Sequence, residues 1–317
     1  MHPTPIRNVV AAVRTRRQNV TASEQSGLSI TKLEKDTMRY IRPFDDAATF
    51  DTGFPGYRAQ FVSHLEDAMF IHSVIQENGC GPGLHYHTSD QLYFLLDGTM
   101  NLQLGEHVHT IGARTLAFIP AGLAHRNWND GPGAENHFEM IIPAPTPGAP
   151  IALMVDSVDD VPPQHRATQE GYVRAVDDGG LREAMPGFRL QPLADPGSGS
   201  LHAVINYAEV DAGSAGPNMH IHPFDQYYLV LDGELTVEVA LQHHVVGPNT
   251  LVVLPAGIPH RQYNSGAVTE RHIVVLAPAP LPNEPWDRGV DFCFNGETHS
   301  GPNDLAAKAP ITAAAPH

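Results

Sequence analysis

Hydrophobic and polar residues alternate with a period of two along much of the middle of the chain. From Thr99 to Leu104 every second residue is apolar, and from Leu235 to Val239 apolar residues alternate with Thr and Glu. Successive side chains of a β-strand point to opposite faces of a sheet, so this alternation predicts strands with one apolar and one polar face. We therefore expect both segments to be half-buried antiparallel strands.

Glycine and proline interrupt these strand patterns at short intervals. Asp97-Gly98 and Asp232-Gly233 each stand between two such runs, and an Asp-Gly pair supplies the positive φ that a tight hairpin turn requires. We therefore predict a hairpin at each pair. A short helix is expected over Gly180–Ala184. Many short strands with hardly a helical segment favour an all-β barrel or double-sheet roll in each half of the chain.

The second half of the chain repeats the first. Residues 81–145 match residues 216–280 at a constant offset of 135 positions, and the shared residues are mostly His, Gln, Gly, Pro and Asn. With 317 residues the chain can form two domains that each bury a core. We place an N-terminal arm at residues 1–45, an N-terminal barrel at 46–150, a connector at 151–185, a C-terminal barrel at 186–284 and a C-terminal tail at 285–317.

Both copies carry the same set of potential metal ligands. Two histidines at i and i+2 of a strand point the same way, and a glutamine of the same parity follows them. A third histidine comes after a Pro-Ala-Gly turn. Three neutral imidazoles and one amide oxygen suit a divalent first-row metal such as iron, nickel, manganese, copper or zinc, and an octahedral ion would keep two positions for water or substrate. The predicted ligands are His85, His87, Gln91 and His125 in the first copy, and His220, His222, Gln226 and His260 in the second.

Charge and cysteine content narrow the possible partners. The formal net charge is −16, with 35 acidic against 19 basic residues, which disfavours binding to the phosphate backbone of nucleic acids. Cys80 and Cys293 have no paired or metal-like spacing, so nothing indicates an oxidising compartment. No apolar run reaches the roughly 20 residues that span a bilayer. We expect a cytoplasmic protein that binds neither nucleic acid nor membrane.

The residues around the predicted ligands resemble the two sequence motifs of the cupin superfamily. The first motif runs from Gly81 to Gln91 and on to Gly98, and the second joins Gly112, Pro120, Gly122, His125 and Asn129. Both motifs occur again 135 positions later, so the chain resembles a bicupin, and specifically the quercetin 2,3-dioxygenase-like group. The resemblance implies two tandem jelly-roll barrels, each with one metal in its interior, and association into a homodimer.

One feature departs from that family's pattern in both copies. The family usually has Glu where this chain has Gln91 and Gln226. An amide neither lowers the net charge of the site nor accepts a proton from substrate. With neutral ligands the ion keeps its full charge and favours an anionic chelating substrate. Each glutamine either ligates the metal directly or supports a ligand by hydrogen bonding.

Several other matched residues have two interpretations each. His137 and His272, with Glu135 and Glu270 on the same strand face, either line the pocket as proton-transfer groups or form ion pairs on the outer face, which we favour. Tyr93 and Tyr228 either reach the pocket or pack in the core. Arg126 and Arg261 follow the last ligand and point away from it, which indicates structural salt bridges. The catalytic residues stay open, with Tyr93, Tyr228, His137 and His272 as pocket candidates.

Three functions are compatible with this sequence. The leading hypothesis is a metal-dependent dioxygenase, with iron as the metal, that cleaves an enol, a catechol or a 2-oxo acid. The alternative is a non-redox isomerase, cyclase or dehydratase that uses the metal as a Lewis acid. A binding or storage protein is the third, and the complete ligand set in both halves argues against it.

Overall fold

The computed structural model describes residues 39–290, 292–294 and 297–299, and in this part of the chain the regular elements are β-strands and five short 3₁₀ helices. From Tyr40 onward the described residues belong to one compact unit. No helix of the described residues is long and apolar enough to cross a membrane. The 3₁₀ helices are η1 Asp46–Ala48, η2 Val158–Asp160, η3 Pro163–His165, η4 Asp178–Gly180 and η5 Pro196–Ser198.

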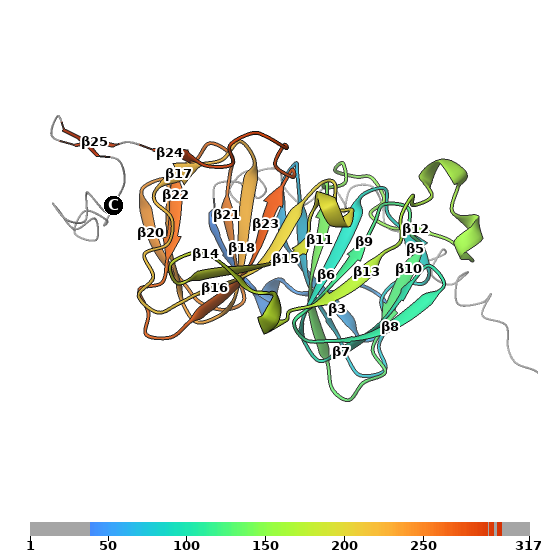
Figure 1. Cartoon of the computed structure of the whole chain (residues 1–317). Helices are drawn as coiled ribbons and strands as arrows, with labels where there is room; N and C mark the ends of the chain where they lie inside the picture. Colours follow the sequence, from blue (N-terminus) through green and yellow to red (C-terminus); the bar gives the residue numbers. More distant parts are fainter. Residues whose placement is uncertain (1–38, 291, 295–296, 300–317) are drawn as a thin grey trace, which may run out of the picture. The chain divides into compact units, whose positions relative to one another are not determined.

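The N-terminal barrel consists of two antiparallel sheets (Figure 1). The seven-stranded sheet has the order β13-β9-β6-β11-β4-β3-β2, and the five-stranded sheet has the order β12-β5-β10-β7-β8. The strands are β2 Phe50–Asp51, β3 Tyr57–His64, β4 Met69–Ile75, β5 His85–Tyr86, β6 Asp90–Asp97, β7 Thr99–Leu104, β8 His107–Gly112, β9 Thr115–Ile119, β10 His125–Trp128, β11 Glu135–Ile142, β12 Leu153–Met154 and β13 Tyr172–Ala175.

The C-terminal barrel repeats this architecture strand for strand. Its sheets have the orders β1-β21-β18-β23-β16-β15-β14 and β20-β19-β22-β17-β24. The strands are β1 Ile41–Pro43, β14 Arg182–Met185, β15 Phe188–Ala194, β16 Val204–Val210, β17 His220–Ile221, β18 Asp225–Asp232, β19 Leu235–Val239, β20 Gln242–Val246, β21 Thr250–Leu254, β22 His260–Tyr263, β23 Glu270–Ala277 and β24 Arg288–Gly289; the hairpin β25 Phe292–Phe294 and β26 Glu297–His299 follows.

The two barrels exchange strands. β1, from the segment expected to be an N-terminal arm, pairs with β21 of the C-terminal barrel. β12 and β13, from the expected connector, pair with β5 and β9 of the N-terminal barrel. β24, from the expected tail, pairs with β17 as β12 does with β5. The repeat therefore continues past residue 280, and our boundaries at 45, 150 and 284 each cut off a strand of a barrel. The rest of the expected arm and tail, residues 1–38 and 300–317, lies outside the described residues.

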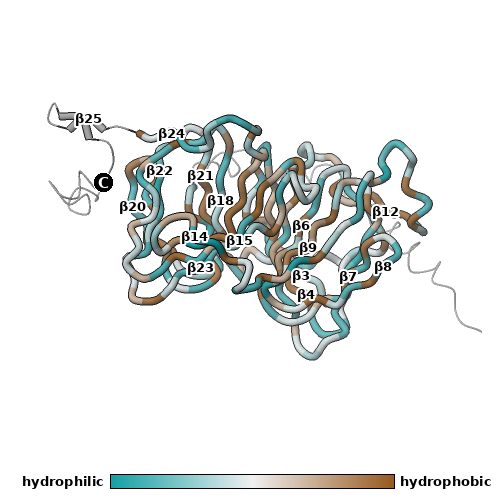
Figure 2. Tube along the Cα trace, viewed as in Figure 1, coloured by the Kyte–Doolittle hydropathy of each residue, from teal (hydrophilic) through white to brown (hydrophobic). Residues whose placement is uncertain are grey.

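The central strands are buried on both faces, and the two faces serve different purposes. On β6, Leu92 and Phe94 belong to a hydrophobic core that also contains residues of the C-terminal barrel. Gln91 and Tyr93, which alternate with them, are buried too and face the barrel interior. Across the shared core, the rings of Phe70 and Tyr227 lie 4.6 Å apart. Hydrophobic stretches accordingly run along the strands in Figure 2.

The alternation of Thr99–Leu104 is confirmed, because β7 buries Met100, Leu102 and Leu104 and leaves the residues between them more exposed. Leu235–Val239 differs from the prediction. Thr236 and Glu238 of this strand are also buried, because Thr236 bonds to Ser265 and Glu238 pairs with Arg261. A polar residue in an alternating strand does not have to face solvent if it has a partner.

The prediction of hairpins at the Asp-Gly pairs is wrong. β6 and β7, on either side of Gly98, belong to different sheets, as do β18 and β19 around Gly233. Both glycines have positive φ, +79° and +74°, and each turns the chain from one sheet to the other. A Cβ on Gly98 would lie 2.6 Å from the carbonyl oxygen of Ala134. The positive φ of these glycines therefore turns the chain between two sheets, which we call a corner, and does not close a hairpin.

The predicted helix over Gly180–Ala184 is also wrong. Gly180 ends the 3₁₀ helix η4, and β14 begins at Arg182. Arg182 and Glu183 pair with Leu190 and Arg189 of β15. Pairing to the neighbouring strand overrides a weak local preference for helix.

Candidate metal centres

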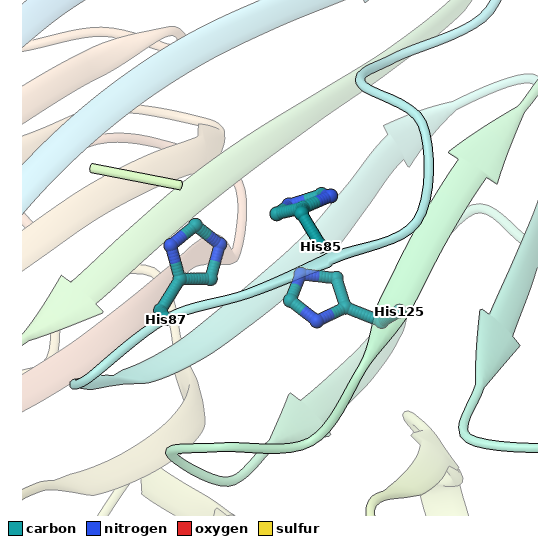
Figure 3. A group of neighbouring side chains, drawn as sticks. All are labelled: His85, His87 and His125. Atoms are coloured by element: carbon teal, nitrogen blue, oxygen red, sulfur yellow. The ribbon is translucent and has the colours of Figure 1, made fainter. Parts of the chain in front are cut away.

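Strand pairing brings the first three histidines together in the N-terminal barrel. His85 of β5 is the register partner of His125 of β10, and His87 follows two residues after His85. Their ring centroids are 4.3 to 5.1 Å apart, and their potential ligand atoms all lie within 4.8 Å of one another. All three are buried. Figure 3 shows His85 and His87 on one segment and His125 on the strand beside it, with the three rings gathered around a common point.

The C-terminal barrel contains the same arrangement. His220 of β17 is the register partner of His260 of β22, and the ligand atoms of His220, His222 and His260 also lie within 4.8 Å of one another. These histidines are buried as well. Each barrel therefore holds a histidine triad that could bind a metal ion.

Backbone carbonyls fix the orientation of the imidazole ring of every histidine in the two triads. In each ring Nδ1 lies at hydrogen-bond distance from a carbonyl oxygen, to which a neutral imidazole donates its proton, so that Nε2 presents a lone pair to the triad. His87 Nε2 is buried without a hydrogen-bond partner in the described structure, which a metal would satisfy. The carbonyls belong to Gly83 for His85, Ile151 for His87, Leu123 for His125, Asn218 for His220, Trp286 for His222 and Ile258 for His260.

Burial lowers the pKa of triad histidines in both barrels. Burial, reinforced by the neighbouring His87, lowers the pKa of His85 to about 4. Burial and the neighbouring His220 lower the pKa of His260 to about 3, and the pKa of His125 lies well below its ordinary value for the same reasons. Since a metal binds the unprotonated ring nitrogen, both triads are ready to bind a cation near neutral pH.

The amide oxygens of the two glutamines point into the triads. Gln91 Oε1 lies 2.7 Å from His125 Nε2. Gln226 Oε1 lies 2.9 Å from His260 Nε2 and 3.1 Å from His222 Nε2. Ligand atoms at right angles around an ion with bonds of about 2.1 Å are about 3 Å apart. The separations therefore fit a fourth ligand position in each barrel.

The same loop geometry places the last histidine of the triad in both barrels. Asp90 Oδ1 accepts a hydrogen bond from the backbone N–H of Ala121, and Asp225 Oδ1 does the same for Ala256, at 2.9 and 2.8 Å. The next residue, Gly122 or Gly257, donates its N–H to the carbonyl of His87 or His222. The Pro-Ala-Gly turn is thus tied to the His-x-His segment. The sequence pattern did not identify either aspartate, although each directly precedes the glutamine.

The outer-face interpretation of His137 and His272 is wrong. Both histidines and their partners Glu135 and Glu270 are 0% exposed. His137 Nδ1 lies 2.9 Å from Glu135 and His272 Nδ1 lies 2.8 Å from Glu270. Burial alone would lower the pKa of His137, but Glu135 and Glu139 outweigh it and raise the pKa to about 10. Strand parity points these pairs into the barrel, on the side of the metal centre.

Tyr93 and Tyr228 pack in the core of their own barrels. The ring of Tyr93 meets His137 edge to face at 5.0 Å, and that of Tyr228 meets His272 at 4.8 Å. Both tyrosines belong to hydrophobic clusters. The core interpretation is confirmed, and a role of their hydroxyls toward a substrate stays a prediction.

Glu139 is the main residue of this region that the sequence pattern did not identify. It is buried, and it accepts hydrogen bonds from Gln91 Nε2 at 3.0 Å and from the hydroxyls of Tyr57 and Ser73 at 2.6 Å each. Burial raises its pKa, but hydrogen bonds and the charge of His137 outweigh that effect and lower the pKa of Glu139 to about 2. The parity it shares with Glu135 and His137 is the signal that could have identified it.

The predicted salt bridge of Arg261 is confirmed, since Arg261 Nη2 lies 2.6 Å from Glu238. Arg126 has a different partner, the amide oxygen of Gln103 at 2.8 Å, and its guanidinium lies over the Trp128 ring. Both arginines point away from the triads and have a structural role.

The comparison with protein families identifies two cupin domains in this chain. The family model described as Cupin domain matches residues 71–140 and again residues 206–275. These ranges contain the complete triads and both glutamines. No curated protein matches the sequence.

Solved structures with the same architecture include enzymes of very different sequence. A structure of oxalate decarboxylase has a TM-score of 0.60 at 11% identity, covering 77% of this chain and 78% of that chain. A mutant of Bacillus subtilis oxalate decarboxylase has a TM-score of 0.58 at 12% identity, covering 75% and 77%. A Pseudomonas aeruginosa protein named for induction by glyoxylate has a TM-score of 0.60 at 16% identity, covering 77% and 91%. At these identities the likeness shows the fold alone. The chain is thus an all-β protein of two tandem cupin barrels, the bicupin architecture, with one histidine triad in each barrel.

Proposed function

We propose that each barrel binds one divalent transition metal and that the protein is a metal-dependent enzyme. The proposed ligands are the triad and the glutamine of each barrel: His85, His87, Gln91 and His125, and His220, His222, Gln226 and His260.

The observation that carries this proposal is the contact between Gln91 and His125. His125 donates its Nδ1–H to the carbonyl of Leu123 and is neutral, so its Nε2 carries a lone pair and no proton. Gln91 Oε1, another acceptor, faces that nitrogen at 2.7 Å. The amide of Gln91 cannot be turned round, because its Nε2 donates to Glu139. Two facing acceptors at this distance repel each other, and a cation between them and the other histidines removes the repulsion.

The ligand chemistry favours a small anionic substrate. Three imidazoles and one amide carry no charge, so a divalent ion keeps its full charge toward the remaining positions. An enolate, a catecholate or a 2-oxo acid would chelate such an ion through two oxygens. The triads lie buried within the barrels, so the chain excludes bulk water from the bound substrate.

The reaction that we propose is cleavage of such a substrate by dioxygen, with iron as the metal. Bound iron would supply the redox chemistry, and the four ligand residues would hold it with positions open for substrate and dioxygen. The alternative is a non-redox isomerase, cyclase or dehydratase. Glu139 and His137 favour this alternative, because such a reaction needs a proton-transfer group and this buried acid–base pair touches the ligand amide.

Oxygen uptake separates the two reactions. The iron-loaded protein, mixed with enols, catechols and 2-oxo acids, is expected to consume dioxygen in proportion to substrate lost, and His85→Ala with His220→Ala should abolish the uptake. Turnover of a substrate without oxygen uptake, under air and under nitrogen alike, would contradict the dioxygenase and support the non-redox enzyme. A matched control is His107→Ala, since His107 is exposed on β8 outside both triads.

We further propose a cytoplasmic location and a homodimer. The sequence predicts both, and size-exclusion chromatography with light scattering tests the second. A monomer at micromolar concentration would contradict it.

A further inference from the structure

The two metal centres have the same types of proposed ligand residues. They differ in the residues that contact the glutamine on the side facing away from the triad. In the N-terminal barrel the Gln91 amide donates to Glu139 on β11. The corresponding residue of β23 is Val274, since Glu139 pairs with Ile71 of β4 and Val274 pairs with Asn206 of β16 at matching register. Val274 is buried and offers no acceptor to Gln226. A carboxylate in one barrel thus stands where the other barrel has an isopropyl group.

Both hydroxyl partners of Glu139 are replaced together with it, whereas its histidine partner His137 has a counterpart in His272. Its oxygen Oε1 accepts from the hydroxyls of Tyr57 and Ser73, which are buried. The matching residues of the C-terminal barrel are Phe188 and Ala208, which have no hydroxyl. The N-terminal barrel therefore has a hydrogen-bonded cluster around the carboxylate, which we call the Glu139 cluster. The C-terminal barrel has apolar side chains at the three matching positions, which we call its apolar wall, and the buried amide of Asn206 lies beside Val274.

The Glu139 cluster fixes the orientation of Gln91. An ionised carboxylate can only accept hydrogen bonds, and Glu139 accepts them from two hydroxyls and the Gln91 amide. The nitrogen of the Gln91 amide therefore faces Glu139 and its oxygen faces His125. Among the described residues the amide nitrogen of Gln226 has no hydrogen-bond partner that would select one orientation of the amide. The oxygen of Gln91 is held toward the triad before any metal arrives, whereas that of Gln226 must be selected by the metal itself.

The cluster also adds charge. Both barrels contain the Glu–His pair on the last long strand, Glu135 with His137 and Glu270 with His272. Glu139 is a further carboxylate, separated from the triad by one amide group. In a buried site the attraction between this carboxylate and a divalent cation is stronger than it would be in water. Glu139 places a negative charge directly behind the four neutral ligands, and His137, whose Nε2 lies 3.2 Å from Glu139 Oε1, offsets part of that charge.

We propose that Glu139 is a positioning residue that makes the N-terminal centre the tighter and more rigid of the two metal centres. This inference rests on the proposed binding of one metal by each barrel. Residues that hydrogen-bond to metal ligands typically change metal affinity by about 10–100-fold when mutated. We expect a difference of that size between the two centres.

The experiment uses two full-length proteins that each keep one centre. His220→Ala/His222→Ala leaves the N-terminal centre, and His85→Ala/His87→Ala leaves the C-terminal one. Each metal-free protein is titrated with Co²⁺, whose visible absorption reports the ligand geometry, and the dissociation constant is taken from the titration. The N-terminal centre should bind Co²⁺ at least about tenfold more tightly.

Variants at residue 139 then separate orientation from charge. Tyr57→Phe/Ser73→Ala/Glu139→Val copies the apolar wall, leaves no buried hydroxyl unpaired and should weaken Co²⁺ binding at the N-terminal centre to the level of the other centre. Glu139→Gln keeps an acceptor for Gln91 and removes the charge, so it should keep the Co²⁺ spectrum and lose only part of the affinity. Circular dichroism checks that each variant is folded.

The outcomes distinguish the inference from the function on which it rests. Equal affinity of the two centres, with the triple variant unchanged in affinity and spectrum, overturns the role of Glu139 and leaves metal binding intact. Absence of Co²⁺ binding in both folded single-centre proteins overturns metal binding and the inference together. A weaker N-terminal centre also overturns the inference.

Discussion

At the scale of single residues, the chain prepares its metal centres before a metal is present. A backbone carbonyl orients the ring of each triad histidine, and burial lowers the pKa of His85, His125 and His260. A buried neutral imidazole and a buried amide oxygen cost free energy when they lack partners. In each barrel the metal-free protein therefore holds imidazole nitrogens and an amide oxygen that lack donors, and binding of a cation removes this free-energy cost.

The lowered histidine pKa values predict how the metal-free protein responds to acid. The pKa values of His85 and His260 are about 4 and about 3 in the folded state, against an ordinary 6.5. At pH values between the folded and the ordinary pKa, these histidines bind more protons in the unfolded chain than in the folded one. The free energy of unfolding therefore falls as pH drops from about 6.5 toward 4. Urea unfolding of the metal-free protein between pH 7 and pH 5 should show falling midpoints.

A matched variant isolates the contribution of the histidines. His85→Ala/His260→Ala should lose stability less steeply over the same pH range. Glu139, whose folded pKa of about 2 lies below the ordinary 4.5, loses its contribution only below that range. An equally steep slope in the variant would show that other groups cause the acid sensitivity.

The sequence predicts well which histidines gather in each barrel and predicts their surroundings poorly. Spacing and duplication identified His85, His87, His125 and their copies, because strand parity follows directly from sequence. Glu139 was missed because the repeat is read from identities, and its counterpart is Val274. A comparison that looks for residues shared by the two copies cannot detect Glu139, because the two copies differ at this position.

At the scale of elements, glycine corners decide how each barrel closes. β6 and β7 are consecutive strands, yet they belong to different sheets, and Gly98 turns the chain between them. A true two-residue hairpin joins β19 to β20 through Ala240 and Leu241, where Val239 pairs with Gln242. Both residues of that turn have positive φ, 49° and 65°, without being glycine.

We predict that Gly98→Ala destabilises the fold. The added Cβ would lie 2.6 Å from the carbonyl oxygen of Ala134 at a φ of +79°. Left-handed backbone conformation costs a non-glycine residue about 1–2 kcal/mol, and the clash adds to this cost. Chemical denaturation should show a loss of at least about 1 kcal/mol.

Gly112→Ala is the matched control. A Cβ at Gly112, at the end of β8, would meet no heavy atom within 4 Å, so this variant should stay within about 0.5 kcal/mol of the wild type. Equal effects of the two substitutions would mean that Gly98 is not required at the corner.

Local patterns predict strands better than they predict which strands pair. The alternation of Thr99–Leu104 identified a strand correctly because its polar face is exposed. The Asp-Gly pairs were read as hairpins because a positive φ serves a corner and a hairpin equally well. Which of the two forms depends on long-range pairing with β9 and β11, about which the turn residues carry no information.

At the scale of the whole molecule, the described part of the chain from Tyr40 onward is one folding unit with two metal centres. The hydrophobic core between the barrels contains residues of both. β1 directly precedes the N-terminal barrel but pairs with the C-terminal one, and β13 directly precedes the C-terminal barrel but pairs with the N-terminal one. Arg42 of β1 also donates a hydrogen bond to Ser63 of β3 at 2.9 Å. Neither barrel is complete without a strand from the other half.

We therefore predict a single cooperative unfolding transition. Phe70→Ala, in the shared core against Tyr227, should destabilise the protein by about 3–5 kcal/mol. Both barrels should unfold together at the lower temperature in calorimetry. Phe61→Ala, at a side chain that is 51% exposed, is the control and should change stability by less than about 1 kcal/mol. Two separate transitions in either variant would contradict a shared unit.

Metal content per chain tests the central claim most directly. Protein purified anaerobically, loaded with metal and freed of excess should contain about two ions per chain by elemental mass spectrometry, and His85→Ala and His220→Ala should each contain about one. The exposed His107→Ala should keep both. Wild-type protein without stoichiometric metal after loading, or triad variants that keep as much metal as the wild type, would contradict the assignment of the two histidine triads as metal centres.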